Sequence, residues 1–430
     1  MRVLIVGATG FIGSAITAAA SRDGITVRGV ARDTENLASR FPNVELFSLD
    51  LRDPIAHKPE TWAAALREVD AVVNAAGILQ PRREQDSWSV HVDAPDALFA
   101  ACEAAGIEKV IQISAVGVEA GNSGFARSKL AGDRKLMTRN LAWTILRPAI
   151  VIGDGSYGGT SMLRAIAAFP GITPVIGDGE TQLDFIHKDD LAQSIVNLLQ
   201  TGAAAKTVME PASGEQLTFT QSVQAYRNWL GLGNAPVLKV PHWCVTCAAR
   251  LGDLFKLDPI TTTAIEQFHT RLTGDAVGFE AATGTQARGL NDVLASRPAE
   301  TQDLWHARLY LMRPVVRLTL AVLWLASGLL GLFADPSVYG AVLAPLTQNQ
   351  LLLSTVAIAT STADLAIAAA LLVGWRLRAF AAIQFVMVLG YTVALTFLEP
   401  QLWGDLFGSV LKNLPVLALI LIHGILERER

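Results

Sequence analysis

Four long apolar segments near the C-terminal end constrain the fold of this chain more than any other feature. They cover residues 315–333, 351–373, 377–398 and about 408–426. Each has about 19–23 residues, and a helix that rises 1.5 Å per residue needs about 20 to cross a hydrocarbon core of about 30 Å. The sequence therefore predicts an all-α bundle of four transmembrane helices over residues 315–430. A buried, soluble helical bundle is the alternative.

Charged residues divide the chain at the same place. Only 12 of the 74 Asp, Glu, Lys and Arg residues lie in 315–430, and the rest precede this region. A net charge of −4 offers no basic surface for nucleic acid, and three cysteines suit a reducing compartment rather than a disulfide framework. We therefore predict a soluble domain over 1–300, a linker over 301–314 and a membrane domain over 315–430.

Basic residues at the ends of the apolar segments predict their orientation. The connections 334–350 and 399–407 hold acidic residues but neither Lys nor Arg. The opposite ends of the segments carry Arg308, Arg313, Arg317, Arg376, Arg378, Arg428 and Arg430. By the positive-inside rule, both termini and the soluble domain face the cytoplasm. This predicts a multi-pass protein of the inner (plasma) membrane.

Apolar runs alternate with helix-like stretches through the first 200 residues. MRVLIVG has the β-branched composition of a buried strand, and FIGSAITAAASRDG has that of a helix. Further strands are predicted at VRGVAR, VELFSLDL, AVVNAAG, KVIQISAVG and WTILRPAIVIG. This alternation predicts an α/β fold with a doubly wound parallel sheet. Residues 151–300, which include the helical stretch HWCVTCAARLGDLF, are expected to form a small substrate-side lobe.

A glycine-rich turn joins the first strand to the first helix. Its glycines would permit a tight turn, the close approach of a pyrophosphate and close packing of the helix on the strand. The helix N-terminus would then face the phosphates with its amides and its positive dipole end. The residues predicted to bind the dinucleotide here are Gly7, Thr9, Gly10, Phe11, Ile12 and Gly13.

The end of the second strand is the place where such folds select their cofactor. An acidic residue there would bind a ribose 2′-hydroxyl, whereas an arginine would bind a 2′-phosphate. Arg32 occupies this position, and its permanently charged fork suits a phosphate. We therefore predict NADP rather than NAD, although Asp33 beside it keeps NAD open.

Several motifs in the family order resemble the short-chain dehydrogenase/reductase superfamily, in its extended or atypical branch. They are GATGFIG, Asp50-Leu51, Asn74-Ala75-Ala76-Gly77, Ile113-Ser114-Ala115, FARSKLAGD, Arg147-Pro148 and DFIHKDDLA. The chain looks most similar to NAD(P)-binding epimerase/dehydratase-like proteins, including relatives of the 39 kDa accessory subunit of respiratory complex I. The four apolar segments are similar to DoxX-like membrane domains.

The resemblance implies a role for each matching position. Asp50 and Leu51 would contact the adenine, and Ala75, Ala76 and Gly77 would line the dinucleotide. Ser114 would face the nicotinamide and the substrate. Lys129 would bind the nicotinamide ribose, and the backbone after Pro148 would meet the carboxamide.

One position departs from the family pattern. The family places a tyrosine four residues before the lysine, where it gives a proton to the substrate carbonyl. Here that residue is Phe125, which has no proton to donate. The chain could be a reductase with another donor, or could act on a quinone-like or other lipid-soluble substrate. It could instead be a non-catalytic sensor or assembly subunit of a membrane complex. Tyr157 in the loop GDGSYGGT is a further candidate to reach the pocket.

Two other groups of residues have both a structural and a functional interpretation. Asp364 lies in the second apolar segment, where it would either lock helices together or mark a site for a proton or a lipid-soluble ligand. Lys412 would be its partner only if the last segment begins near residue 402. The run His187-Lys188-Asp189-Asp190 lacks the ligand spacing of a zinc site, so we predict no metal and a structural role for His187.

Overall fold

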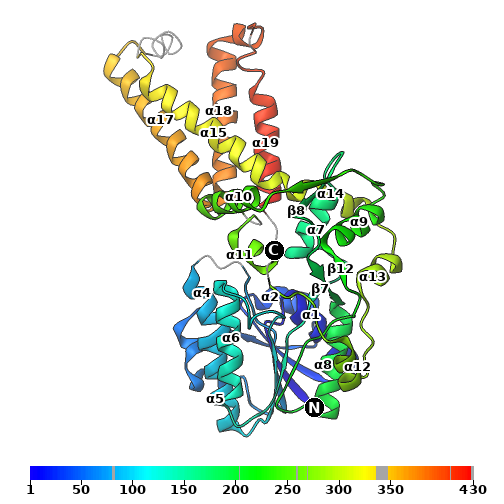
Figure 1. Cartoon of the computed structure of the whole chain (residues 1–430). Helices are drawn as coiled ribbons and strands as arrows, with labels where there is room; N and C mark the ends of the chain where they lie inside the picture. Colours follow the sequence, from blue (N-terminus) through cyan, green and yellow to red (C-terminus); the bar gives the residue numbers. More distant parts are fainter. Residues whose placement is uncertain are drawn as a thin grey trace. The chain divides into compact units, whose positions relative to one another are not determined.

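The computed structural model describes residues 1–79, 83–202, 204–257, 260–268, 270–335, 347–406 and 408–427. Most of the predicted connection 334–350, as well as Arg428 and Arg430, lies outside these residues. The chain divides into two compact units (Figure 1). One comprises Met1–Thr246 and Thr262–Ala307, and the other comprises Cys247–Thr261 and Arg308–Arg430. The segment 247–261, placed in the lobe by its sequence position, therefore packs within the C-terminal unit.

A parallel sheet of seven strands forms the centre of the first unit. Its strand order is β11-β6-β5-β4-β1-β2-β3, so β2 and β3 are added on one side of β1 and the later strands, from β4 on, are added on the other side. This confirms the doubly wound parallel sheet, whose ligands bind at the carboxyl ends of the strands near this change of side. The strands are β1 (Arg2–Val6), β2 (Thr26–Ala31), β3 (Glu45–Ser48), β4 (Ala71–Asn74), β5 (Lys109–Ile113), β6 (Ala142–Leu146) and β11 (Thr207–Met209).

Helices cover both faces of the sheet because successive side chains of β1 point to opposite sides. Val3 and Ile5 pack with α1 and α8, whereas Leu4 and Val6 pack with the core under α3 and α5. Figure 1 shows α4, α5 and α6 on one side and α1, α8 and α12 on the other. The helices are α1 (Phe11–Arg22), α2 (Thr34–Arg40), η1 (Pro54–His57), α3 (Pro59–Trp62), α4 (Glu84–Trp88), η2 (Ser89–Asp93), α5 (Ala94–Ala105), α6 (Gly124–Met137) and α8 (Lys188–Thr201).

The lobe begins where the predicted strand WTILRPAIVIG divides in two. Its first part pairs as β6 in the large sheet, and its second part pairs with β10 in a separate sheet. Pro148 lies at the division, where its missing N–H suits the end of a ladder. The lobe contains β7 (Ile150–Ile152), α7 (Gly159–Ala167), β8 (Thr173–Ile176), β9 (Gln182–Leu183), β10 (Phe185–His187), β12 (Leu217–Thr218), α9 (Phe219–Trp229), β13 (Val237–Val240), α11 (Thr262–Phe268), α12 (Ala276–Thr283) and α13 (Leu290–Ser296). Between β13 and α11, α10 (His242–Phe255) continues into the second unit.

The second unit is helical. Among its described residues, three helices are long and apolar enough to cross a membrane: α15 (Met312–Phe333), α17 (Gln350–Val373) and α18 (Leu377–Leu398). The fourth apolar segment forms the shorter α19 (Asn413–Leu426) after η3 (Pro400–Trp403), so its crossing stays a prediction. Residues 301–310, expected in the linker, form α14 (Thr301–Tyr310).

Candidate functional site

The glycine turn after β1 has the geometry that close approach of a ligand requires. Gly7 has a φ of +80°, and a Cβ there would lie 3.0 Å from the backbone of Ala76. A Cβ on Gly13 would lie 2.1 Å from the carbonyl oxygen of Gly7. No side chain caps the N-terminus of α1 at Gly10, and its first turn has no acidic residue. The amides of this turn can therefore hold an anion.

Thr9, Phe11 and Ile12 complete this turn. Phe11 begins α1, and its ring stacks on that of Tyr157 with centroids 4.9 Å apart. Lys188 lies 5.9 Å above the same ring. Ile12 is half-buried against the core under α1. The fold thus places Tyr157 from the lobe and Lys188 from the start of α8 beside the glycine turn.

Arg32 and Asp50 lie at the neighbouring carboxyl ends of β2 and β3. Arg32 is exposed just beyond β2. The Asp50 carboxylate accepts hydrogen bonds from the Arg52 side chain, among them one from Nε at 3.0 Å and one from Nη2 at 2.6 Å. The bond from Arg52 lowers the pKa of Asp50, and the charge of Arg32 acts in the same direction. Two arginines therefore flank this carboxylate. Only the contact between Asp50 and Arg52 could have revealed the second one.

The residues after β4 pass close to the glycine turn. Ala75 donates its N–H to Val6 O at 3.0 Å, and Ala76 donates to the Asn74 side chain at 3.2 Å. Gly77 lies against Lys129, whose Nζ would be 3.0 Å from an added Cβ. Leu51 differs from its neighbours because its side chain is buried in the core under α3 and α5.

Ser114 and Lys129 meet near the carboxyl end of β5. Lys129 Nζ donates to Ile113 O at 2.9 Å and to Ala76 O at 3.2 Å. The Ser114 hydroxyl donates to Asp133 Oδ2 at 2.8 Å. Asp133 lies four residues after Lys129 on α6, so both side chains share one face of that helix. The fold therefore brings together the two residues predicted to be catalytic and adds Asp133.

Burial dominates the electrostatics of this group. It lowers the pKa of Lys129 from 10.5 to about 8, with Asp133 acting against this shift. It raises the pKa of Asp133, while the bonds from Ser114 and Arg147 act in the opposite direction. Arg147 Nε donates to Asp133 Oδ2 at 3.0 Å. A lysine whose pKa lies near 8 can give up a proton near neutral pH.

Phe125 occupies the position of the family tyrosine without a polar substitute. Its ring meets His91 edge to face, with centroids 5.6 Å apart. His91 is buried and accepts a hydrogen bond from the N–H of Ile78 at 3.0 Å. Burial and the nearby Lys129 charge hold the pKa of His91 well below its usual value. The His91 ring is therefore uncharged and packs against Phe125. Neither ring replaces the family tyrosine as the proton donor.

The backbone after Pro148 is engaged within the protein. The N–H groups of Ala149 and Ile150 donate to Pro211 O at 2.9 Å and to Asp184 O at 3.1 Å. Pro148 O accepts from the N–H of Val116 at 3.1 Å. The contact between this backbone and the nicotinamide carboxamide stays a prediction. The N–H groups of Ala149 and Ile150 already donate to carbonyl oxygens of the protein.

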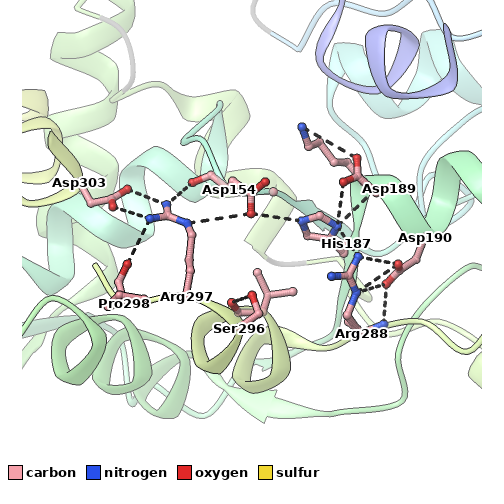
Figure 2. A network of polar contacts seen from close by, with 12 residues as sticks. Asp154, His187, Asp189, Asp190, Arg288, Ser296, Arg297, Pro298 and Asp303 are labelled. Atoms are coloured by element: carbon pink, nitrogen blue, oxygen red, sulfur yellow. Dashed lines mark hydrogen bonds and ion pairs between the residues drawn. The ribbon is translucent and has the colours of Figure 1, made fainter. Parts of the chain in front are cut away.

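A network of polar contacts surrounds His187 in the lobe. Figure 2 shows His187 between Asp154 and Arg288. Arg288 Nη2 lies 2.9 Å from His187 Nδ1, and the N–H of Asp189 donates to the same nitrogen at 3.3 Å. Both partners are donors, so Nδ1 must be the acceptor and Nε2 carries the hydrogen.

This protonation argues against a metal at the group formed by Asp154, His187 and Asp189, although their ligand atoms lie within 4.8 Å of one another. A protonated Nε2 cannot coordinate a cation, and Arg288 adds a positive charge. His187 also caps α8, because Nδ1 accepts from Asp189 N. The geometry therefore supports a structural role for His187.

Two arginines hold the loop that carries Tyr157. Arg297 Nη2 donates to Asp154 O at 2.6 Å, and Arg164 Nη2 donates to Gly153 O at 3.1 Å. Asp303 accepts hydrogen bonds from both arginines (Figure 2 shows its pair with Arg297). Neither arginine belongs to a recognisable sequence motif. Only their tertiary contacts reveal that they fix this loop beside the glycine turn.

Comparison with protein families agrees with this geometry. Residues 7–201 match the NAD(P)H-binding family, and residues 321–421 match the DoxX-like family. The chain thus carries an NAD(P)-binding Rossmann domain followed by a DoxX-like membrane domain, which confirms these parts of the resemblance seen in its motifs.

Its relatives include a ceramide reductase of Caulobacter vibrioides, 25% identical over 252 residues, or 58% of this chain and 77% of that protein. A second is the mitochondrial NADH dehydrogenase [ubiquinone] 1 alpha subcomplex subunit 9 of Dictyostelium discoideum, 25% identical over 226 residues, or 50% of this chain and 60% of that protein. The latter is a complex I subunit of the predicted type.

Solved structures show the same fold. UDP-glucuronic acid 4-epimerase from Bacillus cereus, in complex with NAD, has a TM-score of 0.55 at 18% identity and covers 72% of this chain and 100% of its own. The dTDP-glucose 4,6-dehydratase of Bacillus anthracis, also with NAD, has a TM-score of 0.52 at 17% identity and covers 69% and 96%. At these identities the likeness concerns the fold alone.

Proposed function

We propose that this protein is an NADP(H)-dependent reductase of the inner membrane that acts on a lipid-soluble carbonyl or quinone-like substrate. The observation that carries the proposal is the buried group of Ser114, Lys129 and Asp133 beside the glycine turn, in a chain whose other domain is DoxX-like. Similarity to a ceramide reductase supports a lipid as the substrate class. Four spans with both termini in the cytoplasm would place the soluble domain beside that substrate.

The residues present fit a dinucleotide at the carboxyl ends of the strands. The uncapped amides at the start of α1 suit its pyrophosphate. Gly77 and Lys129 lie where the rest of the dinucleotide could extend from the pyrophosphate. Arg32, supported by Arg52, would hold a 2′-phosphate. When bound, the reduced cofactor would supply a hydride.

Selectivity for NADPH can be tested at Arg32. Arg32→Glu should weaken NADPH binding at least tenfold and leave NADH binding within about twofold, because only NADPH carries the phosphate. Arg22→Glu, an exposed arginine at the end of α1, is the matched control. Titration calorimetry of the full chain in nanodiscs gives both affinities. Equal losses for the two cofactors would refute the role of Arg32.

Lys129 would supply the proton that the family tyrosine supplies elsewhere. Phe125 cannot donate one, whereas the pKa of Lys129 is about 8 and its ammonium donates to the carbonyl oxygen of Ile113, the residue before Ser114. Phe125→Tyr would restore the usual acid next to Lys129. We expect it to raise the rate of NADPH oxidation with a carbonyl substrate at least tenfold, since general acid catalysis contributes about 10²–10⁴-fold.

A non-catalytic NAD(P)H-binding subunit is the second candidate, and Phe125 is the observation that favours it. A panel of long-chain ketones, ceramide-like ketones and quinones separates the two candidates. Oxidation of NADPH by wild-type protein with any member supports the reductase. Saturable NADPH binding without turnover, in wild type and in Phe125→Tyr alike, would refute the reductase and support the binding subunit.

A further inference from the structure

Helix α10 exposes an apolar stripe that nothing in the proposed reaction uses. Trp243, Leu251 and Leu254 are 70%, 55% and 69% exposed. Cys247 is also exposed. These four residues recur every three or four positions, so they lie on one side of the helix. The stripe is thus continuous along the whole of α10.

The opposite side of α10 packs on the protein. Ala249 and Gly252 are buried, and a Cβ on Gly252 would lie 1.6 Å from the carbonyl oxygen of Ile260. Asp253 is exposed between the two sides, whereas Arg250, three residues after Cys247 and four before Leu254, is exposed at the edge of the stripe. A helix with one side seated on its own unit and an apolar side turned outward needs another apolar environment for the second side.

Arg317 ties the end of α10 to the membrane helices of the same unit. It lies in the second turn of α15, is 5% exposed and donates to Phe255 O and Lys256 O, both at 2.8 Å. Its Nε donates to Leu371 O near the end of α17 at 2.6 Å. The end of α10 therefore lies level with the first turns of α15 and the last turns of α17.

At the first turns of α15 and the last turns of α17, a membrane-spanning chain would pass between water and the hydrocarbon core of the membrane. Arginines near the ends of membrane helices reach toward the headgroup region, and helices that lie flat there bury one apolar side by about 5–10 Å. The stripe of α10 therefore lies on a helix whose end is bonded, through Arg317, to the ends of two helices that are apolar enough to cross a membrane. A lipid surface fits it better than a soluble partner does.

We propose that α10 is an interfacial helix whose stripe of Trp243, Cys247, Leu251 and Leu254 lies in the headgroup region of the membrane. The second unit then contacts the bilayer through this helix as well as through its spans. This inference rests on the membrane domain and not on catalysis, so it stands or falls separately from the reductase.

Fluorescence quenching in proteoliposomes tests the depth of each position. The polarity-sensitive dye NBD is attached to a single reactive cysteine of the full chain in a Cys244→Ser background. Cys102 can remain, because burial raises the pKa of its thiol to about 12 and keeps it unreactive. Cys247 is labelled directly. In a Cys247→Ser background, Leu251→Cys, Leu254→Cys and Asp253→Cys are labelled in turn.

Asp253 is the matched control because it is the exposed neighbour of Leu254 on another side of the helix. We expect lipids with a doxyl group near the headgroup to quench positions 247, 251 and 254 at least threefold more than position 253. Aqueous iodide should show the reverse order. Equal quenching of 253 and 254 by either agent would overturn the proposal.

A second copy of the chain could cover the stripe in place of lipid. Oxidative crosslinking of Cys247 in proteoliposomes, at protein-to-lipid ratios lowered tenfold, detects it. A crosslinked dimer that persists on dilution would overturn the lipid assignment in favour of an interface between copies. Saturable NADPH binding, measured on every variant, shows that the soluble unit is folded.

Discussion

The charge of Lys129 should weaken the folded state at neutral pH, and its removal should therefore stabilise the protein. Lys129 is buried, and its pKa is about 8 in the folded chain against 10.5 when exposed. At 1.36 kcal/mol per pKa unit, this difference corresponds to about 3 kcal/mol. Below pH 8 both states hold the proton, so the folded state bears the whole cost. Between pH 8 and 10.5 the unfolded chain binds more protons, and the free energy of unfolding rises with pH.

Lys129→Met removes this cost but also two hydrogen bonds, to Ala76 O and Ile113 O. Each such bond contributes about 1 kcal/mol, so the net stabilisation at pH 7 should be about 1 kcal/mol. The variant should lose the rise in stability above pH 8 and bind NADPH at least tenfold more weakly. Stability would thus be gained where cofactor binding is lost.

Thermal unfolding of the full chain in nanodiscs, measured from pH 6.5 to 10, gives both the sign and the pH window. Lys135→Met on the same helix is the control, because Lys135 is half-exposed and pairs with Asp96 at the surface. Such pairs contribute about 0–1 kcal/mol, with little dependence on pH in this range. A lower unfolding temperature for Lys129→Met at pH 7, or wild-type stability that does not rise above pH 8, would refute the reasoning.

Two further predictions concern the glycine turn and the membrane helices. Gly13→Ala should abolish NADPH binding and cost about 1–3 kcal/mol, because its Cβ would lie 2.1 Å from the carbonyl oxygen of Gly7; unchanged calorimetric affinity would contradict this. In the membrane, Ser327 Oγ donates to Asp364 Oδ2 at 2.6 Å. Asp364→Leu should lower the unfolding free energy in detergent by about 1 kcal/mol, whereas Asp364→Asn retains the acceptor and should stay within about 0.5 kcal/mol. Equal loss in the two variants would point to a need for the carboxyl group itself.

The partner of Asp364 was open at the level of sequence because it depended on where the last helix begins. The structure begins α19 at Asn413, with Lys412 exposed at its N-cap. Asp364 is buried and accepts from Ser327 on α15. This contact joins the two helices, as the structural interpretation expected. Hydropathy locates an apolar helix but leaves its first residue uncertain, so a pairing that turns on a few residues needs the structure.

The sequence alone determined the features that depend on local pattern. The spacing of Gly7, Gly10 and Gly13, placed between a β-branched run and a helix, was enough to predict a dinucleotide-binding turn, because only glycine permits such close backbone approach. Periodicity and length were enough for the parallel sheet and for the apolar helices of the second unit. The replacement of the family tyrosine by Phe125 was also evident from the sequence, because the absence of a hydroxyl group follows from the residue type alone.

Only the tertiary structure decided the features that arise between distant parts of the chain. It set Ser114 against Asp133, brought Arg297 to the carbonyl oxygen of Asp154, and assigned the hydrogen of His187 through Arg288. It also joined Arg317 to the end of α10. The physical reason is common to all four. A hydrogen bond, a pKa and an exposed side depend on which atoms lie within a few ångströms, and the order of residues does not specify that for segments 19 to 143 positions apart.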